Sequence, residues 1–337
     1  MIINRTAMTL AIISILMATA AATAQTSEYV NVDGVQRRYV VHVPDGFDGS
    51  ESLPVLFHFH GGGSTPEGEV SYIDFRPLVN SENFIAVYPA GLPSPGEPAP
   101  GWNSLGPYDN GNDDLGFVES MIDAMVKEYN ADRDRMYACG FSWGANFQFE
   151  LYCYLSDRMA AVVSVAAGMW EWTRSDCNPT TPTGVMSIHG TNDSYNPYNG
   201  NAYNISFNAL NEFLVAENGA TTPPTTETTG NRTHYTWSEG EDCFSVEHIR
   251  VQNGGHDWPS FANQAIWEFV SQYDINGVIG CGDEPLPGDI NGDGIVDGAD
   301  MGLMLLYWGQ CDNCPADLDG DGEVSGADVG LLLVNWT

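Results

Sequence analysis

The chain has 337 residues, with 45 acidic against 11 basic side chains and a formal net charge of −34 at pH 7. This balance argues against nucleic acid and anionic membrane surfaces as partners, because both are bound through basic patches. The length is enough for one large domain with its own core and a small additional module.

The first residues have the pattern of a secretory signal. Arg5 precedes an apolar run from Ala7 to Met17, and a stretch of small residues ends in Ala22-Thr23-Ala24. A charged start, an apolar centre and an A-x-A cleavage site are typical of such signals. The run is short for a membrane anchor, and no second apolar stretch follows it. We therefore predict that residues 1–24 are a signal peptide and that the protein is secreted, with no membrane span.

The next part of the chain, residues 25–278, alternates between strand-like and helix-like stretches. This alternation predicts an α/β fold with a mostly parallel sheet and helices on both faces. Residues 221–229 are rich in Thr and Pro and predict a surface loop. The Gly- and Pro-rich residues 279–288 predict a linker. The expected strands are residues 38–43, 54–59, 84–88, 135–139, 161–165, 185–188 and 246–251, and the expected helices are 115–129, 145–155, 204–216 and 262–273.

Two glycine-containing motifs follow expected strands. His60-Gly61-Gly62-Gly63 comes after residues 54–59, and Gly140-Phe141-Ser142-Trp143-Gly144 comes after residues 135–139. The second motif has the G-x-S-x-G form of a nucleophile elbow, a sharp strand-to-helix turn that exposes a serine hydroxyl. The first resembles the loop that supplies a backbone N–H to an oxyanion hole. Together the two motifs predict a serine hydrolase of the α/β-hydrolase fold.

A serine nucleophile needs an imidazole to take its proton and a carboxylate to orient that imidazole. In this fold the acid and the histidine follow the serine along the chain. Asp193 follows the expected strand 185–188, and His256 follows the last expected strand. Both therefore belong at the sheet edge that carries the site. We predict that Ser142, Asp193 and His256 form a catalytic triad.

Other histidines and carboxylates near these motifs are weaker candidates. His189 is close to Asp193 but belongs to a strand end, where a packed or orienting role is favoured. Asp257 adjoins His256, and the neighbour of a catalytic histidine normally points elsewhere. His60 is expected to brace the glycine loop. His234 and His248 lie in strand-like runs and are expected to be structural, and Asp113 and Asp114 to cap a helix.

The oxyanion of the reaction requires two backbone donors. Trp143 follows the nucleophile and opens a helix, whose dipole favours negative charge. The second donor is expected in the glycine loop, at Gly62. Neither donor requires a cofactor, and we expect none for catalysis.

The C-terminal residues contain an internal repeat of 28 positions. Residues 289–300 return as residues 317–328, and a leucine-rich stretch follows each copy. From Asp283 to the end there are 12 acidic residues and no Lys or Arg. Two near-copies of an acidic loop predict a small metal-binding module at residues 289–337.

The large domain resembles secreted α/β-hydrolases of the polyhydroxybutyrate depolymerase and feruloyl or acetylxylan esterase group. This resemblance implies that Ser142, Asp193 and His256 occupy the triad positions and that Trp258 lines the acyl pocket. It also implies a Cys153–Cys177 disulfide, whereas the expected partner of Cys243 is Ala220 here. A Cys139–Cys243 bridge and a buried free thiol at Cys139 stay open. The motifs that carry the likeness are His60-Gly61-Gly62-Gly63, Asp114-Leu115-Gly116-Phe117, Gly140-Phe141-Ser142-Trp143-Gly144, Leu155-Ser156-Asp157-Arg158, His189-Gly190-Thr191-Asn192-Asp193 and Gly254-Gly255-His256-Asp257-Trp258-Pro259.

The C-terminal repeat resembles a dockerin-type calcium module, which is all-α apart from its loops. The resemblance implies two Ca²⁺ sites and a cohesin-like or cell-surface partner. Dockerins usually contact that partner through hydroxyl-bearing residues, which are replaced here by Gly298-Ala299 and Gly326-Ala327. A second departure is the insertion from Cys311 to Cys314. We expect a disulfide between these two cysteines or from one of them to Cys281. The implied ligands are Asp289, Asn291, Asp293, Ile295, Asp297 and Asp300 in one loop, and Asp317, Asp319, Asp321, Glu323, Ser325 and Asp328 in the other.

The sequence therefore predicts a secreted serine carboxylic-ester hydrolase that acts on polymeric ester substrates. Removal of feruloyl or acetyl groups from plant polysaccharide is the favoured activity. A polyester depolymerase is the alternative, in which exposed aromatic residues such as Trp102, Trp170, Trp172 and Trp258 would grip the polymer. A binding protein on a hydrolase scaffold, displayed through the calcium module, is an alternative of another class. Trp258, Trp102 and Trp170 are the predicted substrate-binding residues.

Overall fold

A computed structural model describes residues 25–94, 97–103, 109–221, 223–238, 240, 243–281, 286–292, 295–311 and 314–336. The predicted signal peptide, residues 1–24, lies outside the described residues, as does part of the predicted linker. Two compact units make up the chain, divided between Gly277 and Val278.

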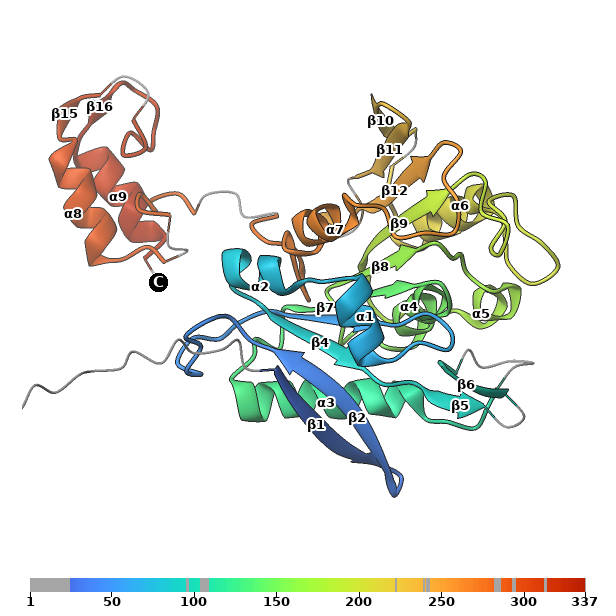
Figure 1. Ribbon diagram of the computed structural model, residues 1–337. Coiled ribbons are helices and arrows are strands. Elements are labelled where there is room, and N and C mark those ends of the chain that lie inside the picture. Colours follow the sequence, from blue (N-terminus) through green and yellow to red (C-terminus); the bar gives the residue numbers. More distant parts are fainter. Residues whose placement is uncertain are drawn as a thin grey trace, which may run out of the picture. The chain divides into compact units, whose positions relative to one another are not determined.

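The larger unit is built on one twisted sheet, which has ten strands in the described part of the chain (Figure 1). Its central strands run parallel, and antiparallel strands flank them on both sides. The order across the sheet is β1 (Gln25–Val32), β2 (Val35–His42), β4 (Ile85–Pro89), β3 (Val55–Phe59), β7 (Met136–Phe141), β8 (Ala161–Val165), β9 (Gly184–Gly190), β12 (Val246–Val251), β11 (Arg232–Trp237) and β10 (Thr225–Thr229). This sheet confirms the predicted α/β fold.

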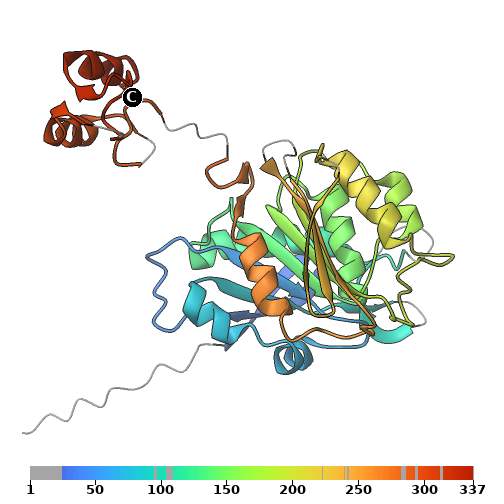
Figure 2. The ribbon, with the colours of Figure 1, turned by 90° about the horizontal axis from the view of Figure 1, so that it is seen from above.

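Helices cover both faces of the sheet (Figures 1 and 2). One face carries α1 (Pro66–Tyr72), α2 (Arg76–Glu82) and α7 (Ala262–Val270), and the other carries α3 (Asp114–Tyr129), α4 (Trp143–Tyr154) and α6 (Phe207–Glu217). A shorter helix, α5 (Glu171–Asp176), follows β8, and the strands β5 (Leu92–Ser94) and β6 (Glu97–Gly101) form a separate hairpin. No helix in the described ranges is both long and apolar enough to cross a bilayer.

The central strands explain why the sheet needs cover on both sides. Every residue of β3, β4, β8 and β9 is buried, as expected for parallel strands between two helical layers. Helix α4 lies so deep that each residue from Gly144 to Cys153 is buried. Its sequence therefore lacks the one-sided apolar stripe of a surface helix.

The prediction of a surface loop at residues 221–229 was wrong in part. Thr225–Thr229 forms strand β10, which pairs with β11 at the sheet edge and has all five residues exposed. Threonine is β-branched and favours strands. The polar composition was therefore a sign of exposure and not of irregular backbone.

The cysteines resolve the alternatives left by the sequence. Cys153 and Cys177 are bonded, as the resemblance implied, and so are Cys311 and Cys314. Cys243 and Cys281 are disulfide-bonded as well, whereas Cys139 is free and buried. This arrangement excludes a Cys139–Cys243 bridge.

The smaller unit repeats one element. Helices α8 (Gly298–Leu306) and α9 (Gly326–Val334) each begin with a capping box, formed by Asp297 with Asp300 and by Ser325 with Asp328. The two-residue strands β15 (Gly309–Gln310) and β16 (Glu323–Val324) pair with each other. A small core is formed by Val296, Met304, Ala316, Val324 and Leu332.

Candidate active site

Ser142 lies at the turn between β7 and α4, in a backbone conformation that few residues adopt. Its φ is 54° and its ψ is −115°, and such strain at a non-glycine residue is typical of functional sites. A Cβ on Gly140 would come within 2.2 Å of the Gly144 carbonyl oxygen, and a Cβ on Gly144 within 2.1 Å of the Phe59 carbonyl oxygen. The turn can therefore form only with glycine at both positions of the motif.

The glycine loop after β3 lies directly against this turn. A Cβ on Gly61 would lie 3.5 Å from Ser142 Cβ, and a Cβ on Gly62 would meet the Trp143 ring at 2.9 Å. His60 braces the loop, since its Nδ1 donates to the Gly61 carbonyl (2.8 Å) and its Nε2 accepts from the Gly91 N–H (2.9 Å). Burial lowers the pKa of His60, which keeps the neutral ring that this bonding requires.

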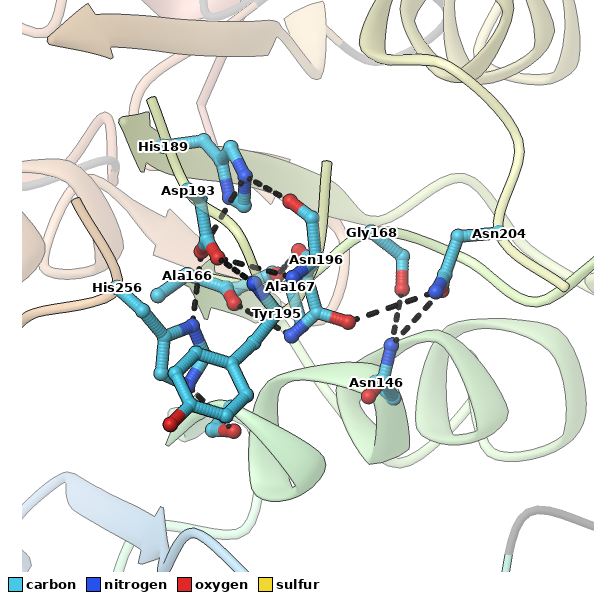
Figure 3. A network of polar contacts seen from close by, with 12 residues as sticks. Asn146, Ala166, Ala167, Gly168, His189, Asp193, Tyr195, Asn196, Asn204 and His256 are labelled. Atoms are coloured by element: carbon cyan, nitrogen blue, oxygen red, sulfur yellow. Dashed lines mark hydrogen bonds and ion pairs between the residues drawn. The ribbon is translucent and has the colours of Figure 1, made fainter. Parts of the chain in front are cut away.

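Ser142, His256 and Asp193 form a continuous hydrogen-bonded line. Ser142 Oγ lies 2.8 Å from His256 Nε2, and His256 Nδ1 lies 2.8 Å from Asp193 Oδ2. An ionised carboxylate can only accept, so Nδ1 carries the ring proton and Nε2 is free to accept the serine proton. Asp193 and His256 come together as the loops after β9 and β12 meet at one sheet edge (Figure 3).

The Asp193 carboxylate is itself held in place by its own loop. Its Oδ1 accepts from the backbone N–H groups of Tyr195 (2.8 Å) and Asn196 (2.9 Å), as Figure 3 shows. Burial raises the pKa of Asp193, but the hydrogen bonds from His256 and from these N–H groups outweigh it and hold the pKa below its usual value. The carboxylate is therefore ionised where it faces the imidazole.

The competing histidines have structural partners. His189 Nε2 donates to the Asn196 carbonyl (2.8 Å), its ring stacks on Phe207, and burial lowers its pKa to about 4. His248 lies buried between Ser187 Oγ (2.7 Å) and the Tyr198 hydroxyl (2.8 Å). Neither ring contacts the Ser142 hydroxyl, whereas His256 does.

The predicted oxyanion donors, Trp143 and Gly62, both belong to the region of the Ser142 turn. Trp143 is the first residue of α4, so its N–H belongs to the unpaired donors of a helix start. Gly62 lies in the loop packed against the Trp143 ring. Within the described residues, neither backbone N–H has a hydrogen-bond acceptor.

Aromatic side chains surround the triad. The Phe141 ring lies 5.2 Å from the His256 ring and 6.2 Å from the Trp258 ring. Tyr72 lies 5.9 Å from Phe141, and Tyr195 lies across His256 at 5.0 Å (Figure 3). Sequence reasoning singled out only Trp258 here; the exposure of Tyr72 and Tyr195 depends on how distant loops pack.

The predicted role of Trp102 as an exposed substrate-binding residue was wrong. Trp102 is 1% exposed, stacks on Phe147, and donates from Nε1 to the His60 carbonyl (2.8 Å). It therefore supports the glycine loop from beneath. Trp170 is half-buried, and its ring stacks on the Trp172 ring at 5.0 Å.

A buried ion pair also went unnoticed in the sequence. Asp114 pairs with Arg37 at 2.5 Å and accepts from the Asn103 N–H at 2.6 Å, while Asp113 alone caps α3 by accepting from Gly116. The motif at residues 114–117 was the available signal. Its carboxylate ties the segment after β6 to β2.

The acidic loops of the smaller unit have the donor chemistry of a Ca²⁺ site. Carboxylate oxygens of Asp317, Asp319 and Asp321 lie within 4.8 Å of one another. Such convergence of like charges is unfavourable unless a cation lies between them. The buried Asp328 accepts from the Leu318 and Ser325 N–H groups, which closes the loop, so the residues fit hard oxygen coordination.

The first loop has the same frame. Asp300 accepts from the Ile290 N–H (2.8 Å) and the Asp297 N–H (2.9 Å), 28 positions before the equivalent bonds of Asp328. Asp289 accepts from Gly292, as Asp317 does from Gly320. The predicted ligand Asp293 lies outside the described residues.

Comparisons with known proteins agree with this division. Residues 287–334 match the family model of the dockerin type I domain, so the C-terminal unit is a dockerin, and dockerin domains in general bind calcium.

The larger unit is similar to curated ester hydrolases. It is 29% identical over 254 residues to the bifunctional acetylxylan esterase/xylanase XynS20E of Neocallimastix patriciarum, covering 75% of this chain and 36% of that protein. It is 25% identical over 248 residues to the probable feruloyl esterase C of Aspergillus clavatus, covering 69% and 82%. The chain thus spans only about a third of the length of the first of these relatives.

Solved structures share the fold of the larger unit. An acetyl xylan esterase from Aspergillus awamori superposes with a TM-score of 0.55 at 16% identity, over 73% of this chain and 99% of that one. A CE1 ferulic acid esterase from Anaeromyces mucronatus gives 0.52 at 20% identity, over 75% and 90%. The larger unit has the α/β-hydrolase fold, and the relatives and structures named above are carboxylic-ester hydrolases.

Proposed function

We propose that this chain is a secreted serine esterase that removes acyl groups from plant polysaccharide through an acyl-enzyme intermediate. The observation that carries the proposal is the line of hydrogen bonds from Ser142 through His256 to Asp193. Relatives named as acetylxylan and feruloyl esterases support the class of substrate.

In the first half of the reaction, Ser142 Oγ attacks the ester carbonyl carbon while its proton moves to His256 Nε2. Asp193 stabilises the imidazolium that forms, because its carboxylate accepts from Nδ1. The tetrahedral intermediate then collapses: the bond to the sugar oxygen breaks, and His256 returns the proton to that oxygen. The acyl group stays on Ser142.

In the second half, water repeats the attack. His256 takes a proton from the water, the hydroxide adds to the acyl carbon, and the bond to Ser142 Oγ breaks with return of the proton. The products are a free carboxylic acid and the regenerated serine, and no cofactor enters either step.

The N–H groups of Trp143 and Gly62 are the proposed donors to the oxyanion. Both are backbone groups held by packing, so they need no reorganisation when charge develops. Loss of one such donor typically costs about 3 kcal/mol of transition-state stabilisation.

The acyl group is proposed to be aromatic rather than acetyl. A wall of rings lies beside His256: Phe141 and Tyr195 contact the His256 ring, and Tyr72 and Trp258 contact Phe141. A planar hydroxycinnamoyl group would pack on such rings, whereas an acetyl group would leave most of the wall unused.

The smaller unit is proposed to bind two Ca²⁺ ions and a cohesin-like partner. Apolar side chains that recur 28 positions apart stay exposed on it, and exposed apolar patches commonly mark protein interfaces. This surface would substitute for the hydroxyl-bearing contacts that the loops lack. The exposed residues are Leu305, Leu306, Trp308, Leu333, Val334 and Trp336.

The test is a panel of substrates with the wild type and Ser142→Ala. We expect hydrolysis of methyl ferulate and of 4-nitrophenyl acetate by the wild type only, with slower release of acetate from acetylated xylan and none of hydroxybutyrate from polyhydroxybutyrate. Equal rates for the two proteins on every ester would end the enzyme proposal. Faster turnover of acetylated xylan would overturn the aromatic acyl preference alone.

A further inference from the structure

A groove lies between helix α6 and strands β11 and β12. Its volume is about 800 Å³, and none of Ser142, Asp193 and His256 lines it. Neither the esterase reaction nor the calcium loops account for this groove. Its lining combines flat aromatic rings with side-chain amides, which is the chemistry of a polar ligand site with apolar walls.

One wall is an aromatic strip on β11. Tyr235 and Trp237 are two residues apart, so their side chains leave the strand on the same face. Their rings lie 6.1 Å apart and within 21° of parallel. The Tyr235 ring is held in place, because the His248 ring lies 6.0 Å from it and the Arg250 guanidinium lies over it at 5.6 Å from the ring centroid. The strip therefore presents two nearly parallel rings in fixed positions.

The opposite wall is helix α6, which contributes amides. Asn208 is exposed, and Asn211 is 7% exposed with an Oδ1 that has no hydrogen-bond partner among the described residues. An unsatisfied buried acceptor is unfavourable unless a ligand or water donates to it. The amides offer both donors and acceptors without net charge.

The groove also borders the loop that carries the triad acid. Tyr198 lines it five positions after Asp193, and its hydroxyl bonds to His248 Nε2 at 2.8 Å. His248 in turn bonds to Ser187 Oγ at 2.7 Å. This buried chain fixes the wall of the groove next to the acid loop.

We propose that this groove binds a neutral oligosaccharide chain, whose sugar faces stack on Tyr235 and Trp237 while its hydroxyls bond to Asn208 and Asn211. Sugar rings have apolar C–H faces and a rim of hydroxyls, so they match a flat aromatic strip opposite amides. The lining includes one arginine, Arg250, and one glutamate, Glu212. Their opposite charges balance, which disfavours a strongly charged ligand. The choice of a plant polysaccharide chain rests on the proposed function, but the groove itself does not.

The test measures xylohexaose binding by calorimetry with the full chain, Ca²⁺ present and Ser142→Ala as the background. We expect binding by the parent and roughly tenfold weaker binding by Trp237→Ala, the loss of one stacked ring. Trp237→Phe should retain most of the affinity. The matched control is Tyr29→Ala, since Tyr29 is 58% exposed on β1 at the far edge of the sheet.

Activity on 4-nitrophenyl acetate separates this proposal from the proposed function. In the chain with its native Ser142, Trp237→Ala should leave that activity unchanged, because the small ester does not reach the groove. If Trp237→Ala does not fold, Asn208→Ala on the exposed side of α6 is used instead. Absence of xylohexaose binding, or equal weakening of binding by Tyr29→Ala, would overturn the proposal that the groove binds an oligosaccharide. Binding of xylohexaose without any esterase activity would overturn the proposed function and still support oligosaccharide binding in the groove.

Discussion

At the scale of single residues, Asp193 is the side chain whose surroundings say most about its role. It is buried, and its carboxylate accepts from two backbone N–H groups as well as from His256. The two bonds from backbone N–H groups orient the carboxylate independently of the imidazole. These bonds support the proposed role of Asp193 as a preorganised partner for the imidazolium and not as a proton donor.

Replacing Asp193 by Asn should lower kcat for 4-nitrophenyl acetate by about 10⁴-fold. The amide cannot stabilise the imidazolium and favours the wrong ring tautomer. Stopped-flow or steady-state rates measure the loss, and thermal unfolding checks the fold. Asp257→Asn is the matched control, since Asp257 is exposed beside His256 and should change kcat only a few-fold. An equal loss in both variants would contradict the assignment of the acid.

Glu150 is a second informative residue, outside the reaction. It is fully buried on α4, accepts from the Thr173 hydroxyl at 2.6 Å, and has no partner for Oε2 in the described part of the chain. Burial raises the pKa of Glu150 to about 8. Between its usual pKa and this value, the unfolded carboxyl is ionised while the folded one is protonated. The folded state then binds more protons, so its stability falls as pH rises, by at most about 1.4 kcal/mol per pH unit.

We expect Glu150→Gln to be more stable than the wild type at pH 8, with the difference shrinking towards pH 5. The amide is a neutral isostere and removes the need to hold a proton at high pH. Thermal unfolding across this pH range measures the effect, with Glu217→Gln as the control at an exposed site. A stability difference that does not change with pH would contradict the role of this carboxyl.

At the scale of elements, the junction of β7 with α4 is tightly constrained. The strand, the turn and the helix approach so closely that two glycines face backbone atoms of neighbouring segments. The β3 loop packs on the same junction, with Trp102 and His60 beneath it. Exposure of the Ser142 hydroxyl is therefore a consequence of packing among three segments.

Gly140→Ala should lower the free energy of unfolding by at least about 3 kcal/mol, because its Cβ would overlap the Gly144 carbonyl, which cannot move without the helix. Denaturant unfolding measures the change. Gly255→Ala is the control, since no atom lies within 4 Å of a Cβ built there, and it should unfold like the wild type. Comparable stability of Gly140→Ala would show that the turn is less tight than described.

At the scale of the whole molecule, the chain has two units, each with its own hydrophobic core. The larger one buries a sheet between helices, and the smaller one has a core of only a few apolar side chains. A core of that size is marginal by itself. The smaller unit should therefore depend on calcium for its stability, and the larger unit should not.

Calorimetry of the full chain should show two unfolding transitions, of which chelation by EDTA lowers only the one that belongs to the smaller unit. Saturating Ca²⁺ at about a hundred times its Kd would stabilise that unit by about 2.7 kcal/mol per site. Asp321→Ala should reduce the calcium effect, whereas Glu323→Gln should not, because that position is proposed to bind through its carbonyl. A calcium effect on the larger transition would contradict the separation.

Much of the fold could be predicted because its signals are local. The apolar runs at residues 54–59, 84–88 and 161–165 became buried parallel strands. The prediction of a loop was wrong at residues 225–229, since threonines without an apolar face carry no periodicity to distinguish an exposed edge strand from a loop. Strand pairing decided that case.

The sequence by itself determined the elbow motif and the acidic loops, because the residue types that mark each of them lie within a dozen contiguous positions. The prediction of Asp193 and His256 followed from the chain order of this fold and from their places after expected strands. Only the tertiary structure decided that Trp102 is buried, that Cys139 has no disulfide partner, and that Tyr72 and Tyr195 stand beside His256. Burial and proximity depend on contacts between segments far apart in the chain, and residue type alone does not specify them.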